Sequence, residues 1–355
     1  MFFYFLRFLL LPLGWIYGLI VEIIRFSYRN GWKKSRRSDV ATIVVGNLST
    51  GGTGKTPQVE YILRHLSKYQ QLVVLSRGYG RKSKGFHTVK TTDNAEISGD
   101  EPLQIARKFP EVPVIVSEDR VSAIEQILKN HQHTQLIVLD DAMQHHALKA
   151  DCYLLLCSFQ KPFFEDFILP VGNLREFRFN YKRADIMIVS KCPANLSMAE
   201  ADKFLLKLKP LKQQKVFFSY LHYGAPYCSK DFEKKISWQD LVGFEVLFVS
   251  GIADTQSLES ELNAQKINYK ILKYPDHHQF TEQDKKIILK KFQNISHSKK
   301  ILLCTEKDAT KLTSLLDNSN LYILPIEVEI AFNKTPDLQR ALVEVMYRKK
   351  GYPTG

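Results

Sequence analysis

The stretch Ser49-Thr-Gly-Gly-Thr-Gly-Lys-Thr56 (STGGTGKT) decides the fold of this 355-residue chain. It follows the apolar run 41–45 and precedes a segment, 57–66, whose apolar residues recur at helical spacing. A glycine-rich loop between a strand and a helix turns its backbone N–H groups toward phosphate oxygens, and the helix N-terminus adds partial positive charge. The sequence therefore predicts a phosphate-binding loop made of Ser49, Thr50, Gly51, Gly52, Thr53, Gly54, Lys55 and Thr56.

The loop matches the Walker A signature G-x-x-x-x-G-K-[ST] at Gly54, Lys55 and Thr56, while Ser49 replaces the leading glycine. Lys55 is expected to reach the β- and γ-phosphates, and the Thr56 hydroxyl to ligate Mg²⁺. An ordinary glycine-rich turn is the alternative reading. We favour nucleotide binding because G-K-T, strand and helix occur together.

A second carboxylate site is expected for the metal. The apolar run QLIVL ends in Asp140 and Asp141, as a Walker B strand does. A capping pair at the end of a strand is the alternative. Given the phosphate loop, we predict that at least one of these carboxylates binds Mg²⁺.

From about residue 40, short apolar runs alternate with longer amphipathic stretches. The runs are ATIVVG, QLVVLSR, VPVIVS, QLIVLDD, CYLLLCS, ADIMIVS and KVFFSY. Most are apolar on both faces, which is typical of parallel strands covered by helices on both sides. The fold class is therefore α/β, a doubly wound phosphate-loop NTPase sheet. A second set, EVLFVSG, KINYKIL, KILLCT and LYILPIE, predicts a smaller α/β domain.

The chain length is consistent with two domains of roughly 100–200 residues each. We predict a membrane-associated helix and basic segment over 1–37 and a phosphate-loop domain over 38–225. The smaller α/β domain is expected over 226–328, after a linker at Tyr223–Trp238. A C-terminal helix within 329–355 is expected to pack back on the phosphate-loop domain.

The N-terminal segment departs from the globular pattern. Residues 1–24 are almost entirely apolar, and a basic run without acidic residues follows over 25–37. This order is the reverse of a signal peptide. The apolar stretch Phe8–Val21 is shorter than the ~20 residues of a membrane span, and Pro12 and Gly14 weaken it as a continuous helix. We expect a helix at the membrane surface with the basic run on anionic headgroups. A transmembrane helix and a helix packed on the core are the alternatives.

The formal net charge of +13 indicates an anionic partner, either nucleic acid, a phosphorylated substrate or anionic lipid. Because much of the charge adjoins the apolar segment, lipid headgroups fit better and no nucleic acid is expected. The five cysteines form no C-x-x-C, so neither a disulfide framework nor a zinc site is indicated. The pairs His145–His146 and His277–His278 lack a recognisable metal-ligand spacing.

Seven motifs occur in order: VGNLSTGGTGKTP, LSRGYGR, GDEP, LDDAMQHH, LPVGNLRE, DHHQF and TEKDATKL. Together they resemble the tetraacyldisaccharide 4′-kinases of bacterial lipid A biosynthesis, from the apolar N-terminus to near residue 312. The resemblance implies ATP and Mg²⁺ as cofactors, an ATP cleft between two domains, and location on the cytoplasmic face of the inner membrane. The implied reaction phosphorylates the 4′-hydroxyl of tetraacyldisaccharide 1-phosphate, a lipid disaccharide, to give lipid IVA. The sequence departs from the family pattern at Ala142, Met143, His146, Val171, Asn173 and Phe177.

The resemblance also implies roles for individual residues. Asp100 of GDEP matches the family's catalytic aspartate, and His277 matches the histidine that pairs with it. Asp140, Asp141 and Glu176 match acidic residues near the metal, and Gln144 matches a glutamine at the same site. We regard Arg77 and Arg120 as candidates for binding the phosphate that the acceptor already carries.

The chemistry fits these residue types independently. A carboxylate can take the proton of a weakly nucleophilic sugar hydroxyl, and a histidine bonded to it would orient it. Asp100 as a simple helix cap and His277 as a loop histidine held by Asp276 are the alternatives. Lys307 is read either as a contact to the nucleotide or as an ion pair with Asp308.

Three other functions compete with this reading. A membrane-recruited ATPase switch often carries an early lysine in its phosphate loop, which STGGTGKT lacks. A kinase of a soluble metabolite would not need the apolar N-terminus. A nucleic-acid-binding protein would spread its positive charge more widely.

Overall fold

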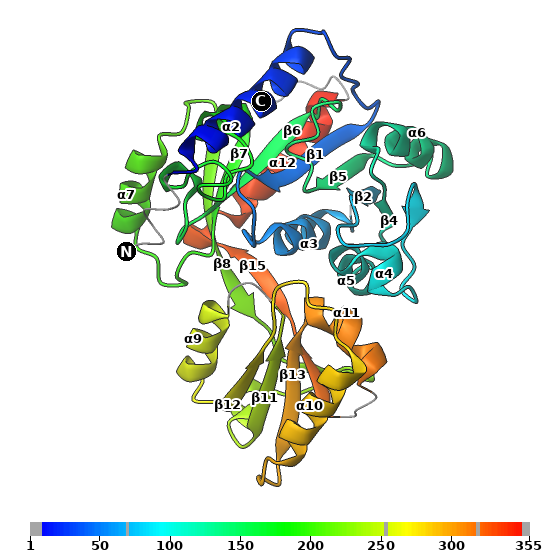
Figure 1. Cartoon of the computed structure of the whole chain (residues 1–355), viewed down its shortest axis with the longest axis vertical. Coiled ribbons are helices and arrows are strands. Elements are labelled where there is room, and N and C mark those ends of the chain that lie inside the picture. Colours follow the sequence, from blue (N-terminus) through cyan, green and yellow to red (C-terminus); the bar gives the residue numbers. More distant parts are fainter. Residues whose placement is uncertain (1–8, 69–70, 252–254, 317–319, 350–355) are drawn as a thin grey trace.

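The computed structural model describes residues 9–68, 71–251, 255–316 and 320–349. Within these ranges the chain forms two β-sheets, and Figure 1 shows them in two lobes that meet at two strands. These strands, β8 (Lys215–Tyr223) and β15 (Ile326–Ile330), pair antiparallel at one edge of the larger sheet. We call the part with the larger sheet the first lobe, and residues 224–325 the second lobe.

The first-lobe sheet has the strand order β15-β8-β7-β6-β1-β5-β2-β4-β3. Strands β1, β2 and β4 to β8 run parallel, and β3 and β15 join antiparallel at the two edges. The predicted doubly wound α/β fold is thereby confirmed, with antiparallel edge strands that the sequence patterns did not reveal. The remaining strands are β1 (Ala41–Asn47), β2 (Leu72–Ser76), β3 (His87–Thr88), β4 (Val114–Val116), β5 (Leu136–Asp140), β6 (Cys152–Ser158) and β7 (Ile186–Ser190).

Helices cover both faces of this sheet because its central strands are apolar on both parities. One face packs on α3 (Lys55–Leu66), α5 (Asp100–Lys108) and α12 (Thr335–Lys349). The other face packs on α6 (Arg120–Asn130) and α7 (Met198–Leu208). Short helices complete the lobe: α4 (Ala95–Ser98), η1 (Phe163–Glu165), η2 (Arg178–Arg183) and η3 (Ala331–Asn333).

The second-lobe sheet has the order β10-β9-β14-β13-β11-β12. Its parallel part is β11 (Glu245–Ser250), β12 (Asn268–Lys273), β13 (Lys300–Thr305) and β14 (Leu321–Leu324), and its antiparallel edge is β9 (Tyr227–Cys228) and β10 (Asp231–Lys235). One face packs on α9 (Gln256–Ala264), near the short α8 (Trp238–Leu241). The other face packs on α10 (Glu282–Gln293) and α11 (Glu306–Leu315).

Two sequence-based expectations about the connection between the lobes were wrong. The segment Tyr223–Trp238 is more than a linker, because it contributes β9 and β10 to the second sheet. LYILPIE is not one strand: Pro325 divides it into β14 of the second sheet and β15 of the first. Proline donates no backbone hydrogen bond. The carbonyl of Pro325 accepts a hydrogen bond from Gly224 N at 3.1 Å. The two chain crossings between the lobes therefore lie side by side.

The N-terminal helix α2 (Leu11–Arg29) is continuous, so the expectation that Pro12 and Gly14 weaken it was wrong. Proline in the first turn removes no intrahelical hydrogen bond. Gly14 and Gly18 face the protein, and a Cβ on Gly18 would clash with the ring of Phe177. The other side of α2 exposes Leu13, Trp15, Ile16, Leu19, Ile20, Ile23 and Ile24.

By length and hydropathy α2 is the one helix in the described ranges that could cross a membrane, and 17% of the residues in its apolar window are buried. Residues 1–8 of the predicted N-terminal segment lie outside the described residues.

Candidate active site

A cavity of about 640 Å³ opens between the two lobes, at the carboxyl ends of the first-lobe strands. This is the edge of an open α/β sheet at which ligands bind. The first lobe lines the cavity with the phosphate loop and the ends of β2 and β5, and the second lobe lines it with Asp276, His277 and 305–307.

All eight residues of the predicted phosphate loop line this cavity. Gly51 and Gly54 have φ of 97° and 85°, a left-handed conformation that glycine adopts without steric cost. The loop is fixed from outside: Asn47 Nδ2 donates to Thr53 Oγ1 at 2.9 Å, and Ser190 Oγ donates to the Thr53 carbonyl at 2.8 Å. The first turn of α3 directs its free N–H groups toward the cavity, which favours an anion there.

The two carboxylates after β5 lie in the same cavity but in different environments. Asp141 contacts two cations, Lys55 at 3.7 Å and Arg175 at 2.8 Å. Asp140 is 1% exposed, and Ser76 Oγ donates to its Oδ2 at 3.3 Å. Burial, assisted by the charges of Glu101 and Asp141, raises the pKa of Asp140 to about 7.

This environment fits Mg²⁺. Asp140 Oδ1 is buried and has no hydrogen-bond partner among the described residues, and a hard cation is a suitable partner for such an oxygen. No group of three or more acidic, histidine or cysteine side chains with metal-binding geometry occurs in the described part of the chain. Mg²⁺ usually takes one or two protein carboxylates and completes its shell with phosphates and waters. The site thus fits a cation that arrives with a nucleotide.

The structure does not bring Glu176 together with these carboxylates. Glu176 is fully buried, pairs with Arg183 at 2.6 Å and accepts from Gln144 Nε2 at 2.7 Å. It is also absent from the described residues that line the cavity. Its implied role as a metal ligand is therefore not supported, because both carboxylate oxygens are taken by Arg183 and Gln144. What Glu176 does is orient Gln144, which does line the cavity.

The structure places Asp100 and His277 in contact, although they are 177 residues apart and in different lobes. Asp100 begins α5 and is 5% exposed. It is not among the described residues that line the cavity, whereas its neighbour Glu101 and its partner His277 are. Its Oδ2 meets His277 Nδ1 at 3.0 Å and accepts from Lys311 Nζ at 3.0 Å. The helix-cap alternative does not hold, because Gly99 is the N-cap of α5 and no side chain caps this helix. The other alternative holds locally, since Asp276 Oδ1 accepts from His277 N.

Charges from the second lobe set the protonation of Asp100. Burial by itself would raise its pKa, but the hydrogen bond with His277 and the charges of Lys311 and Lys307 bring the pKa well below its ordinary value. The hydrogen bond to Asp100 in turn raises the pKa of His277, against burial and the charge of Lys307. Lys307 Nζ lies 3.3 Å from His277 Nε2. An ammonium can only donate, so Nε2 accepts there and Nδ1–H donates to Asp100.

Lys307 does not pair with Asp308, as one of its two readings proposed. It contacts Asp276 at 3.0 Å and Glu101 at 3.8 Å, and it lines the cavity. Asp308 instead accepts from Thr305 Oγ1 and from Gly251 N. Three charged residues of the site, Glu101, Arg175 and Lys311, were not predicted from the sequence. All three lie inside the quoted motifs GDEP, LPVGNLRE and TEKDATKL, and this position in the motifs was the available signal.

A polar group of side chains completes the first-lobe wall of the cavity. Arg77, Arg120, Gln144 and His145 all line it. Arg120 is 5% exposed and donates to the Glu118 carbonyl, and its Nε has no partner among the described residues. Gln144 Oε1 and His145 Nε2 are likewise buried and unpaired there. Buried polar atoms without partners are costly, which indicates that a polar ligand satisfies them.

The departures from the family pattern concern packing. Ala142 and Met143 are buried, and a Cβ on Gly46 would lie 2.7 Å from the Met143 Cβ. Phe177 packs on Gly18 of α2. The carbonyl of Asn173 accepts from Thr50 N at 2.7 Å, so this position supports the phosphate loop through its backbone.

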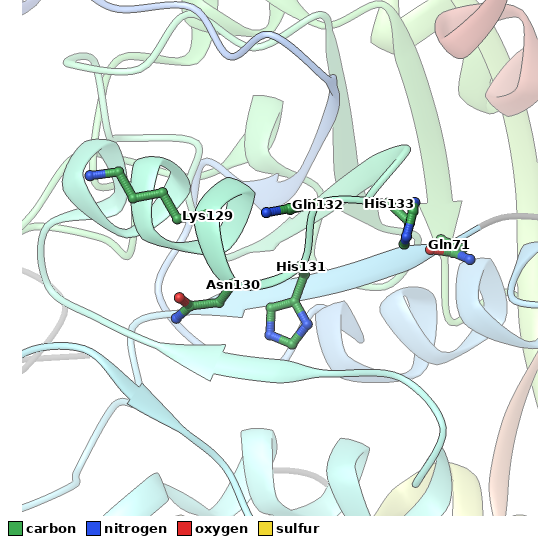
Figure 2. Close-up of a pocket in the computed structure, with 6 residues that line it drawn as sticks. All are labelled: Gln71, Lys129, Asn130, His131, Gln132 and His133. Carbon is green, nitrogen blue, oxygen red and sulfur yellow. The ribbon is translucent and has the colours of Figure 1, made fainter.

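A second hollow lies at the opposite ends of the first-lobe strands, before β2 and β5. It is lined by Gln71, Lys129, Asn130, His131, Gln132 and His133. Figure 2 shows that these side chains point in different directions rather than toward one centre. It therefore lacks the convergent polar groups of the cleft between the lobes.

Known proteins resemble this chain over most of its length. The sequence profile described as tetraacyldisaccharide-1-P 4′-kinase matches residues 6–347. The tetraacyldisaccharide 4′-kinase of Flavobacterium johnsoniae is 43% identical, over 91% of this chain and 92% of that one. The enzyme of the same name from Bacteroides fragilis is 35% identical, over 94% and 92%.

Among solved structures, the fold is similar to LpxK from Aquifex aeolicus, described as an "apo" form in complex with ATP. The TM-score is 0.76 at 29% sequence identity, covering 96% of this chain and all of that one. The chain therefore belongs to the tetraacyldisaccharide-1-P 4′-kinase family.

Proposed function

We propose that this protein transfers the γ-phosphate of ATP to the 4′-hydroxyl of tetraacyldisaccharide 1-phosphate, giving lipid IVA for lipid A biosynthesis. Family membership supports the acceptor, and the A. aeolicus relative with ATP supports the nucleotide. The observation that carries the proposal is the cleft itself. A phosphate loop from the first lobe faces an Asp100–His277 pair that only the second lobe completes.

The phosphate loop and its neighbours hold the nucleotide. Backbone N–H groups of 51–55 and the Lys55 ammonium bind its phosphates, with Thr56, Asp140 and Asp141 arranged to hold Mg²⁺. The bound cation supplies positive charge to the phosphates. Leu221, Tyr223 and Ile326 line the cavity where the two lobes join, and they offer an apolar wall to the nucleoside.

Asp100 acts as the base for the acceptor hydroxyl. Its Oδ2 is engaged by His277 and Lys311, whereas Oδ1 has the single backbone donor Glu101 N. Oδ1 is therefore the atom with capacity to take the proton. His277 holds the carboxylate in place through Nδ1–H. Arg77 and Arg120 are cations on the same wall of the cavity and suit the phosphate that the acceptor carries.

The exposed face of α2 would bring the enzyme to its lipid acceptor. Its large apolar side chains form an exposed stripe, and the basic residues Arg29, Lys33 and Lys34 lie at its end. This arrangement suits an anionic membrane surface. Because ATP is a cytosolic nucleotide, the surface would be the cytoplasmic face of the inner membrane.

A transfer assay tests the proposal. Detergent-solubilised protein is mixed with radiolabelled ATP, Mg²⁺ and tetraacyldisaccharide 1-phosphate, and the labelled lipid is separated from nucleotide. We expect label in the lipid from the wild type and none from Lys55→Ala. Release of inorganic phosphate without lipid labelling would contradict the proposal and favour a membrane-recruited ATPase.

A further inference from the structure

Two helices from different lobes meet through opposite charges beside the active site. Helix α5 of the first lobe supplies Asp100 and Glu101, and helix α11 of the second lobe supplies Lys307 and Lys311. Lys311 contacts Asp100 at 3.0 Å, and Lys307 contacts Glu101 at 3.8 Å. At the other end of α5, Lys108 reaches Glu306, the first residue of α11, at 2.8 Å. The contacts run in opposite directions along the two helices, as an antiparallel pair requires.

Lys311 is distinct among these cations because it touches the base and not the cavity. Its Nζ donates to Asp100 Oδ2 and to the His278 carbonyl, at 3.0 and 3.2 Å. Its side chain is 8% exposed. Lys307 lines the cavity, whereas Lys311 is not among the described residues that do. Lys311 and Asp100 thus contact each other behind His277, which does line the cavity.

The cation matters because Asp100 is buried. Burial of a carboxylate favours its neutral form, which cannot accept a proton. The groups that face Asp100 are His277, Lys311 and Lys307 from the second lobe, and Glu101 from its own helix. Lys311 is the cation in direct contact. Removing it leaves a buried acid with two hydrogen-bonding partners, His277 and the Glu101 N–H, and a nearby like charge.

We propose that Lys311 is a positioning residue for the reaction. From the second lobe it fixes the Asp100 carboxylate beside His277 and maintains its charge, so that the base is competent only when α11 lies against α5. This inference rests on the proposed role of Asp100 as the base. The Lys311 side chain, which touches neither substrate, would link proton transfer to the contact between the lobes.

The test is the pH profile of kcat in Lys311→Met and Lys311→Gln, measured from about pH 5 to 9. An opposite charge at this distance lowers an aspartate pKa by roughly 1–3 units. Both variants should therefore show an acid limb shifted upward by at least about one unit, with the largest rate loss at low pH. Lys311→Arg should keep the wild-type limb. The KM for ATP should stay within about twofold in all three, because the nucleotide lies on the phosphate loop.

Lys349→Met is the matched control. Lys349 also pairs with an aspartate, Asp151 at 3.2 Å, but within the first lobe and away from the cavity. It should leave the pH profile unchanged. Thermal unfolding of each variant shows whether it is folded, and Lys311→Gln, which retains hydrogen bonding, provides the test if Lys311→Met does not fold.

Loss of rate by the same factor at every pH in Lys311→Gln would overturn the inference, since that is the effect of a structural role alone. So would an Arg variant that behaves like the Gln variant. Asp100→Asn distinguishes an error in the proposed base from an error in the proposed role of Lys311. If it retains wild-type turnover, the proposed base is wrong. If it loses activity while Lys311→Gln has the wild-type profile, only the role of Lys311 is wrong.

Discussion

The two halves of the active site are built in different ways. The phosphate site comes from one continuous loop between β1 and α3, supported by the ends of neighbouring first-lobe strands. The base site is divided, because Asp100 belongs to α5 whereas His277 and Lys311 belong to the second lobe. The first half is complete within one lobe, and the second half exists only where two lobes touch.

This difference separates two steps of the reaction. Nucleotide binding depends on local backbone geometry and should persist when the lobes move apart. Proton transfer depends on distances across the cleft and should not. The crossings Gly224 and Pro325 lie next to each other, so a small rotation there would change the distance between α5 and α11. Because α5 and α11 are already in contact in this structure, movement of the lobes away from each other would take the base site apart.

Lys55→Ala disrupts the phosphate site, which lies within one lobe, and should have the largest effect on the transfer rate. The variant loses the cation that contacts the phosphates, so transfer to the lipid should fall to background and ATP binding should weaken as well. Radiolabel transfer and nucleotide titration measure the two effects. Lys349→Ala, a lysine variant remote from the cavity, should leave both unchanged. Wild-type rates in Lys55→Ala would show that the loop is not the phosphate site.

Asp100→Asn disrupts the base site, to which both lobes contribute. It keeps the shape but removes basicity, so kcat should fall by about 10²–10⁴-fold while ATP affinity changes little. His277→Ala should cost less, because it removes orientation only.

In the double variant of Asp100 and His277 the losses should be non-additive, since the residues act as a unit. A double variant with the full product of the single losses would indicate independent roles. An Asp100→Asn variant with weaker ATP binding and normal turnover would make Asp100 a residue of the metal site.

Neutralising the basic end of α2 tests whether the membrane contact is separate from the cleft. Replacing Arg29, Lys33 and Lys34 by Gln should weaken binding to anionic vesicles by roughly 1 kcal/mol per residue, about 100-fold in total. Turnover on detergent-solubilised acceptor should be unchanged, because these residues lie outside the cavity. Vesicle sedimentation measures binding, and neutral vesicles are the control. Equal binding of variant and wild type to anionic vesicles would contradict the proposed membrane contact. Helix α2 would then be an ordinary helix on the protein surface.

Glu306→Gln tests the contact between α5 and α11 and should have the smallest effect of these variants. Burial, together with the charge of Glu60 and against the charge of Lys108, raises the pKa of Glu306 from 4.5 to about 7. A carboxyl group with a raised folded-state pKa contributes stability below its unfolded pKa, and that contribution is lost as pH rises through its folded pKa.

The wild type should therefore lose melting temperature relative to Glu306→Gln between about pH 4.5 and 7, by a few degrees. Scanning calorimetry across this window is the measurement. Parallel curves for the two proteins would mean that Glu306 ionises normally in the folded state.

Local sequence determined most of the first half of the site. A glycine-rich loop, an apolar run before it and a helical pattern after it suffice to predict a phosphate loop, because every part lies within about 25 residues. The alternation of apolar runs likewise predicted the α/β fold, since burial on both faces is visible in the strand sequences themselves. The resemblance of the motifs identified Asp100 and His277 as site residues, but it gave no information on the distance between them.

Tertiary structure decided which side chains meet. Glu176 looks like any acidic residue near a metal motif, and only packing shows that Arg183 and Gln144 occupy it. Pro325 lies inside an apolar run that reads as one strand, yet it sends the chain from one sheet to the other. Lys311 is an ordinary helical lysine by sequence, and its contact with Asp100 spans 211 positions. Such contacts depend on how two separately folded sheets are set against each other, and no local pattern of residues encodes that arrangement.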